Sequence, residues 1–238
     1  MKVFKKIVAL TCVLTCLMAT SVSATVADYY DIGFMKFNGV YVNRLGQPIP
    51  NVVARGVDVS SYQGVINWQA VATDDVSFAF IRCGTTNTGV DQMLDANAIG
   101  AASVGIPFGL YYRTYAPNEE IAKLEATYTV LCAQKYGATL PLVMDIEGST
   151  LAALGTEQLQ KNIQAFCDVV RASGYTPMVY SSKSFMNTYI KSTPCDKWIA
   201  QYGDNFTYAG GGARYWQCSS HGWVNGIEGR VDIDFRFN

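Results

Sequence analysis

The sequence predicts an α/β fold, a barrel in which β-strands alternate with α-helices and whose C-terminal third is irregular and poor in helices. Three observations predict it. From Gly56 onward, short apolar runs typical of buried strands alternate with helical segments. Polar side chains recur where these runs end, and ligands bind at such strand ends in α/β barrels. Regular helical segments stop near Lys191, although strands continue toward the C-terminus.

The predicted elements follow one another in a regular order. Strands are expected at residues 56–60, 76–82, 107–112, 140–147, 176–180, 198–202, 214–218 and 231–234. Helices are expected between them at residues 66–71, 92–104, 117–136, 156–172 and 183–190. Pro117 opens the third of these helices, and Thr156 caps the fourth. We therefore expect a closed barrel of parallel strands in which residues 56–238 form one domain.

Residues 1–24 have the pattern of a secretory signal peptide. Three lysines precede an apolar run that ends at Met18, and Val22-Ser23-Ala24 has the small residues of a cleavage site. We expect cleavage after Ala24 and a secreted, cell-wall-associated, monomeric protein. The apolar run is too short for a stable membrane anchor.

Residues 25–55 form an extension before the barrel. Within it, residues 37–49 predict a short β-hairpin, with turn residues at Asn38-Gly39 and at Gly46. This hairpin either packs on the barrel or belongs to a linker.

Charge and cysteine content limit the possible partners. Removing the three lysines of residues 1–24 leaves 15 basic and 19 acidic side chains, a balance that argues against nucleic acid as a partner.

Five cysteines remain after removal of residues 1–24, an odd number, so at least one is unpaired or pairs between chains. Cys195 and Cys218 flank two predicted strands and are the expected disulfide. No Cys or His spacing indicates a zinc site.

A pair of carboxylates ends the fourth predicted strand. Asp145 and Glu147 are two positions apart, so their side chains should project from the same face of the strand. Gly148 then allows the backbone to turn. Two neighbouring acids raise each other's pKa, which suits general acid/base catalysis. The alternative is a pair that caps a helix or sits in a salt bridge.

Further acids should gather at the same mouth of the barrel. Asp58 ends the first strand, and Asp232 and Asp234 share a face of the last one. Acids this close titrate together, so one of them should stay protonated at neutral pH. A hard-cation site for Mg²⁺ or Ca²⁺ is the rival interpretation of four of these acids, Asp58, Asp145, Glu147 and Asp232. The only histidine, His221, sits in a glycine-flanked loop, which argues against a nucleophilic triad.

Several motifs together resemble glycoside hydrolase family 25, the Chalaropsis-type lysozymes or N-acetylmuramidases. The match opens with Gly56-Val57-Asp58-Val59-Ser60-Ser61-Tyr62-Gln63-Gly64. It continues, in the family's order, through residues 66–68, 80–82, 109–111, 145–147, 198–202, 215–217 and 231–234. Each motif is short, but the ordered set is specific and covers residues 56–238.

The resemblance implies a modified TIM-like barrel that needs no metal or other cofactor. Its partner would be the glycan strands of peptidoglycan, cleaved with retention at the β-1,4 bond from N-acetylmuramic acid to N-acetylglucosamine. By position, Glu147 resembles the general acid/base. Asp145 resembles the group that either attacks the anomeric carbon or steadies the substrate's acetamido group. Asp58 and Asp232 resemble the remaining acids of the cleft.

Other polar and aromatic residues are expected to bind the sugars. They are Tyr62, Gln63, Arg82, Tyr111, Tyr180, Gln201, Trp216 and Asp234. One position departs from the family, because many members have histidine where this chain has Tyr112. A chitinase also ends its fourth strand in Asp-x-Glu, but its motif needs another aspartate where this chain has Val143. A glycan-binding barrel without catalytic activity is the second hypothesis.

Overall fold

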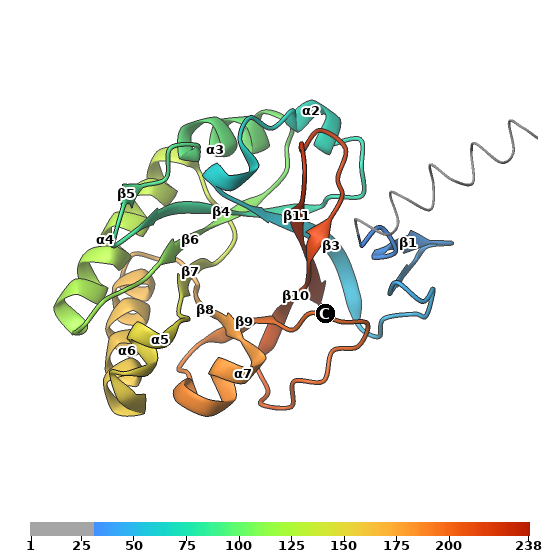
Figure 1. The fold of residues 1–238 in the computed structure, drawn as a ribbon. Helices are drawn as coiled ribbons and strands as arrows, with labels where there is room; N and C mark the ends of the chain where they lie inside the picture. Colours follow the sequence, from blue (N-terminus) through green and yellow to red (C-terminus); the bar gives the residue numbers. More distant parts are fainter. Residues whose placement is uncertain (1–30) are drawn as a thin grey trace, which may run out of the picture.

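The computed structural model describes residues 31–238, and its centre is a closed barrel (Figure 1). In spatial order the strands are β3 (Val52–Val59), β11 (Val231–Phe237), β10 (Ala213–Gly222), β9 (Asp196–Ala200), β8 (Pro177–Ser182), β7 (Leu142–Asp145), β6 (Phe108–Arg113) and β4 (Phe78–Thr85). Strand β4 pairs back to β3 and closes the ring, while β5 (Gly89–Val90) adds a short edge to β4. The predicted α/β barrel is confirmed. The predicted signal peptide, residues 1–24, lies outside the described residues.

One strand runs against the others. β11 is antiparallel to both of its neighbours, β10 and β3, so the prediction of an all-parallel barrel is wrong here. Residues 223–230 join β10 to β11, and so short a connection forms a hairpin, whereas a parallel crossover needs a dozen or more residues. As a result, the first residues of β11 lie at the mouth where the parallel strands end, and Asp232 pairs with Asp58.

The helices cover one side of the barrel. They are α2 (Trp68–Val71), α3 (Leu94–Ser103), α4 (Glu119–Tyr136), α5 (Ser149–Ala152), α6 (Gly155–Ala172) and α7 (Lys183–Phe185), with a 3-10 turn η1 (Ser61–Gln63) and a π-helical turn η2 (Met186–Ile190). Asn118 caps α4, its side chain accepting from the amide of Ile121. Thr156 does not cap α6, because that helix already begins at Gly155. As expected, the described part of the chain has no helix after η2.

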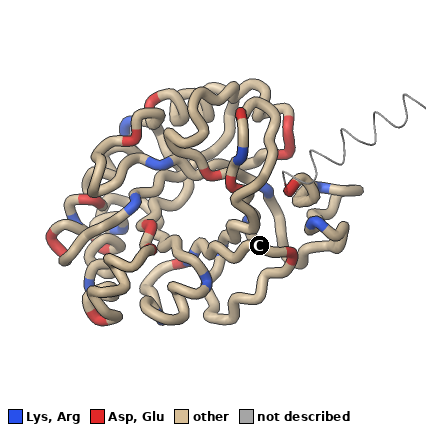
Figure 2. Tube along the Cα trace, viewed as in Figure 1, with Lys and Arg blue, Asp and Glu red and all other residues tan. Residues whose placement is uncertain are grey.

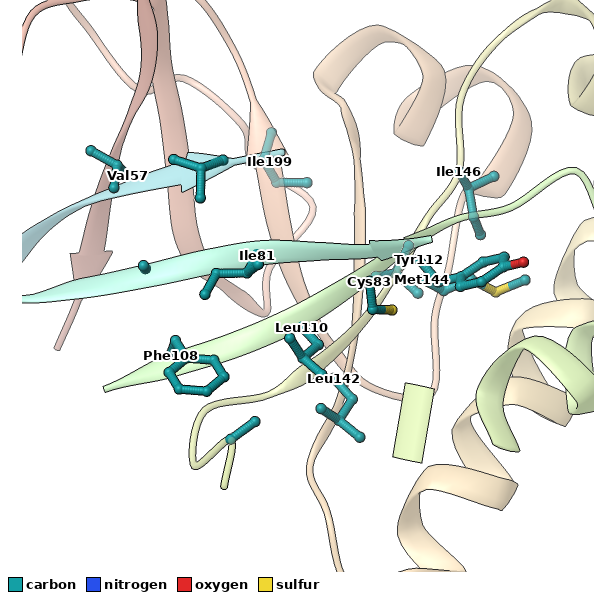
Figure 3. Packing of buried hydrophobic residues seen from close by; sticks show 14 of the residues in the cluster. Val57, Ile81, Cys83, Phe108, Leu110, Tyr112, Leu142, Met144, Ile146 and Ile199 are labelled. Atoms are coloured by element: carbon teal, nitrogen blue, oxygen red, sulfur yellow. The ribbon is translucent and has the colours of Figure 1, made fainter. Parts of the chain in front are cut away.

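Alternation along the strands separates two layers of side chains. One set fills the barrel with aromatic rings, among them Phe78, Phe80, Trp198 and Tyr215. The alternate set points outward and packs against the helices, and Figure 3 shows part of this outer layer. The rings fill the lower part of the barrel interior, and the cleft at the mouth lies above them.

The N-terminal extension covers the side of the barrel that has no helices. β1 (Met35–Phe37) and β2 (Val40–Val42) form an antiparallel hairpin beside β3 (Figure 1). The Phe34 side chain is 1% exposed, and its ring lies 6.2 Å from that of Trp216 and 6.1 Å from that of Phe235. Of the two possibilities for this segment, packing on the barrel is the one observed.

The expected Cys195–Cys218 pair does not form. Gln217 pairs with Ala200 at the C-terminal end of β9, whereas Cys195 precedes the N-terminal end of that strand. The two cysteines are therefore separated by a full strand length. Cys195 instead lies beside Cys167 of α6, with 3.3 Å between the sulfur atoms. Over residues 31–238, no helix is long and apolar enough to cross a membrane.

If the extension is part of the folded core, Phe34→Ala should lower the free energy of unfolding by about 3 to 5 kcal/mol, the usual cost of removing a buried phenylalanine ring. Phe37→Ala is the matched control on the same hairpin, since its side chain is 60% exposed. The control should change stability by less than about 0.5 kcal/mol. Urea denaturation of both variants measures the difference, and equal stabilities would contradict the packing role.

Candidate active site

A cleft of about 450 Å³ opens at the mouth of the barrel. It is lined by Asp58, Ser60, Tyr62, Gln63, Arg82, Thr85, Asn87, Thr88, Tyr111, Arg113, Tyr115, Asp145, Glu147, Tyr180, Trp198, Gln217 and Asp232. All four acids predicted to be catalytic are among these residues. Figure 2 shows acidic and basic positions close together around the middle of the barrel.

The backbone around Asp145 and Glu147 is held firmly. The amide of Ile146 donates to the carbonyl oxygen of Tyr180 at 3.0 Å, and the hydroxyl of Ser181 donates to the carbonyl oxygen of Ile146 at 2.6 Å. Gly148 follows with φ of +99°, a conformation that favours glycine. Asp145 is consequently buried at the strand end, whereas the Glu147 side chain is 35% exposed toward the cleft.

Arg113, which was not among the predicted site residues, lies between the two acids. Nη1 of Arg113 is 3.3 Å from Oδ1 of Asp145, and the same atom contacts Oε1 of Glu147. The pair therefore does sit in a salt bridge, within the cleft. Arg113 comes two residues after Tyr111, so the same alternation that placed Tyr111 in the cleft could have identified it. Its positive charge favours the ionised form of both carboxylates.

Burial and Arg113 act in opposite directions on Asp145. Burial is the larger effect and raises the pKa of Asp145 to about 6, whereas the charge of Arg113 lowers it. Asp145 is therefore mostly ionised at neutral pH.

Asp58 and Asp232, on the other wall of the cleft, have more strongly raised pKa values than Asp145. Burial, and then the charge of Asp58, raise the pKa of Asp232 to about 9. Burial followed by the charge of Asp234 also raises the pKa of Asp58 well above its usual range. Asp232 therefore keeps its proton at neutral pH, whereas a hard cation needs ionised oxygen ligands. Within residues 31–238, no group of three or more acids, histidines or cysteines is arranged to hold a metal ion.

The residues at the rim are fixed by contacts among themselves. Arg82 donates to Asp91 at 2.7 Å and to Ser61 at 3.0 Å, and its guanidinium lies 5.0 Å from the ring centre of Tyr62. The Tyr62 side chain is 85% exposed, so the upper face of its ring is open to a ligand. The side-chain oxygen of Gln63 accepts from the amide of Ser60, which closes η1.

The inner wall of the cleft is hydrogen bonded as one unit. Tyr180 donates through its hydroxyl to Oε1 of Gln217 at 2.7 Å, and Nε2 of Gln217 donates to Oδ2 of Asp58 at 2.7 Å. Tyr111 and Tyr180 both line the cleft, as predicted from their place at strand ends. Gln217 therefore couples an aromatic wall residue to the acid cluster.

Three residues predicted to bind sugars do not line the cleft. Trp216 is fully buried on the outer face of β10, because Gln217 takes the inward position. The Gln201 side chain instead bonds the carbonyl oxygen of Asn205 at 2.8 Å. Asp234 is 0% exposed and accepts from Nε1 of Trp198 at 2.7 Å.

One position that departs from the family lies outside the cleft, and several residues that line the cleft were not predicted. Tyr112, where many family members have histidine, points outward to Tyr128, so this departure does not alter the cleft. Trp198 lines the cleft because alternation along β9 turns it inward. Asn87 and Tyr115 come from loops, where no periodic signal exists to reveal them.

Comparison with known proteins agrees with this geometry. The family model for glycosyl hydrolases family 25 matches residues 57–227. The chain belongs to glycosyl hydrolase family 25. It is therefore a glycoside hydrolase, and the matched region contains Asp58, Asp145 and Glu147 but not Asp232.

Individual proteins are similar over most of this chain. Lysozyme M1 of Streptomyces globisporus is 30% identical over 200 residues, which are 77% of this chain and 67% of that protein. The structure of the modular autolysin LytC from Streptococcus pneumoniae, in complex with a synthetic peptidoglycan ligand, has a TM-score of 0.76 at 25% identity and covers 87% of this chain. The bacterial lysozyme from Streptomyces coelicolor has a TM-score of 0.68 at 28% identity, over 78% of this chain and 92% of its own. This chain spans only about half of LytC, 52% of its length.

The raised pKa of Asp232 predicts how stability depends on pH. The folded protein keeps this proton up to about pH 9, whereas the unfolded chain loses it near pH ~4, so the free energy of unfolding should fall between these values. Asp232→Asn should raise stability at pH 7 and make the decline shallower. Urea denaturation at several pH values measures this dependence. Asp168→Asn is the control, because the Asp168 side chain on α6 is 60% exposed. Identical slopes in wild type and Asp232→Asn would contradict the assigned protonation state.

Proposed function

We propose that this family 25 enzyme is an exported lysozyme that cleaves the β-1,4 bond from N-acetylmuramic acid to N-acetylglucosamine in peptidoglycan. The observation that carries the proposal is the placement of Asp145 and Glu147 together on one wall of the cleft. The lysozymes and the autolysin to which the chain is similar support the choice of substrate. Residues 1–24, with the pattern of a signal peptide, support export to the cell wall.

In the proposed reaction, Glu147 is the general acid and then the general base. Its exposed carboxyl group protonates the leaving glycosidic oxygen, and in the second step it takes a proton from the attacking water. Asp145, ionised and buried, stabilises positive charge at the anomeric carbon. The protonated Asp232 can donate a hydrogen bond to the sugar without adding charge to the cleft.

The closeness of the two carboxylates supports retention of configuration. Both contact the same nitrogen of Arg113, and a charged N–H···O contact spans roughly 3 Å, so the two oxygens lie within roughly 6 Å of each other. Retaining enzymes separate their carboxyl groups by roughly 5 Å, and inverting enzymes by more. This spacing fits direct attack by Asp145, while assistance by the substrate's acetamido group remains the alternative route.

The reaction requires a protonated Glu147 and an ionised Asp145, although both carboxyl groups contact Arg113. Glu147 must carry a proton to act as an acid, but contact with Arg113 favours its ionised form. Asp145 must stay ionised, which Arg113 supports. We propose that a bound sugar separates Glu147 from Arg113, while Arg113 remains with Asp145.

The role of Glu147 predicts that Glu147→Gln lowers kcat/KM by a factor of at least about 10² and leaves the affinity for peptidoglycan nearly unchanged, since the amide keeps the shape but cannot transfer the proton. Glu157→Gln is the control, because Glu157 lies on α6 with an 84% exposed side chain. Full activity in Glu147→Gln would contradict the assignment. A wild-type protein that binds peptidoglycan without cleaving it would support the glycan-binding alternative.

The bond specificity predicts which sugar carries the new reducing end. After digestion of purified peptidoglycan and borohydride reduction, muramic acid should be recovered as its alcohol. Recovery of reduced glucosamine instead would show cleavage of the other glycosidic bond. Since the proposed reaction uses no metal, EDTA should leave the rate unchanged.

Removing Arg113 should move the acid limb of the pH–activity profile to higher pH. Without the neighbouring positive charge, the pKa of Asp145 rises above about 6, so more alkaline conditions are needed to ionise it. In Arg113→Ala the midpoint of the acid limb of kcat/KM should rise by about one pH unit. Arg214→Ala is the control, because Arg214 pairs with Asp196 at the opposite end of the barrel. An acid limb that stays in place or moves to lower pH would contradict the role of Arg113.

A further inference from the structure

Two cysteine sulfurs lie close together near the end of the barrel opposite the cleft. Cys167 is on α6, Cys195 directly precedes β9, and their Sγ atoms are 3.3 Å apart. The residues between them form the return from α6 through β8, α7 and η2 to β9. Gln160 of α6 also bonds the carbonyl oxygen of Ile190 at 3.2 Å, so the helix and this return segment already pack together.

The surroundings make the two thiols unequal. Cys195 is partly exposed, whereas Cys167 is fully buried. The guanidinium of Arg171, one helical turn after Cys167, donates to the carbonyl oxygen of Pro194 and so lies beside Cys195. The hydrogen bond with the Cys167 thiol lowers the pKa of the Cys195 thiol. Burial raises that pKa and the charge of Arg171 lowers it, so that the pKa of Cys195 is below its usual range. Cys195 is thus the thiol that an external reagent reaches first as a thiolate.

We propose that Cys167 and Cys195 form a disulfide that staples α6 to the start of β9. The oxidant is a disulfide, either a small molecule or an oxidoreductase. The Cys195 thiolate attacks one of its sulfurs and releases the other as a thiol. Cys167 then loses its proton and attacks Sγ of Cys195, which releases the second thiol. The protein gives up two electrons and two protons, and the oxidant's disulfide is reduced to two thiols.

The disulfide would hold residues 183–195, which join two strands that carry cleft residues. It closes a loop between residues 28 positions apart, which restricts the unfolded chain. Within this loop, Lys191 has φ of +63°, an unfavourable conformation for lysine that the surrounding packing has to hold. The strands on either side of residues 183–195 carry Tyr180 and Trp198 into the cleft. The inference does not depend on which glycosidic bond the enzyme cleaves.

Peptide mapping tests the disulfide directly. The purified full chain is equilibrated with oxidised and reduced glutathione, alkylated, denatured and digested with trypsin. Cleavage after Lys161, Arg171, Lys191 and Lys197 should release residues 162–171 and 192–197 as one cross-linked species that reductant separates. Cys195→Ser should abolish this species. Glutathione attached to Cys195 together with a free Cys167 at equilibrium would overturn the proposal.

Thermal unfolding gives a second readout that does not depend on recovering one peptide. Oxidation should raise the unfolding midpoint of the wild type by about 5 to 10 °C relative to the reduced protein. Cys132→Ser, which removes a cysteine of α4, should keep this response, and Cys195→Ser should lose it. Equal midpoints for the oxidised and reduced wild type would contradict a stabilising staple.

Discussion

The antiparallel pairing of β11 with β3 is the interaction on which the rest of the structure depends. It closes the barrel, and it turns the beginning of β11 toward the mouth at which the parallel strands end. Asp232 is thereby placed opposite Asp58, and Asp234 is placed below them against Trp198. The same closure leaves β10 and β11 without helices outside them. The N-terminal extension, which lies outside the matched family region, fills that gap with Phe34.

Closure also divides the cleft into two electrostatic halves. On the β3 and β11 side, burial and then the charge of Asp58 raise the pKa of Asp232 to about 9, so Asp232 keeps its proton. On the β6 and β7 side, Arg113 favours negative charge on Asp145 and Glu147. A glycoside hydrolase needs one carboxyl group that donates a proton and another that stays ionised. The difference between the halves arises from the register of the strands and from the position of one arginine.

The sequence was sufficient to predict the barrel and the acids, because both follow from periodic patterns. Alternating strand and helix segments indicated the fold, and strand ends located Asp58, Asp145, Glu147 and Asp232. Features set by tertiary contacts were not predictable in this way. The direction of β11 depends on a short connection, and the burial of Trp216 depends on which alternate residue faces inward. The partner of Cys195 was misjudged for a similar reason, since sequence proximity to strands does not reveal which end of a strand a residue occupies.

Barrel closure gives the acids of one cleft different protonation states. NMR titration of side-chain carboxyl carbons in protein labelled with ¹³C-aspartate measures those states one by one, with assignment by Asp→Asn variants. We expect Asp145 to titrate at about pH 6 and Asp232 at about pH 9. Titration of both carboxyl groups near the ordinary aspartate value, at pH ~4, would contradict the account.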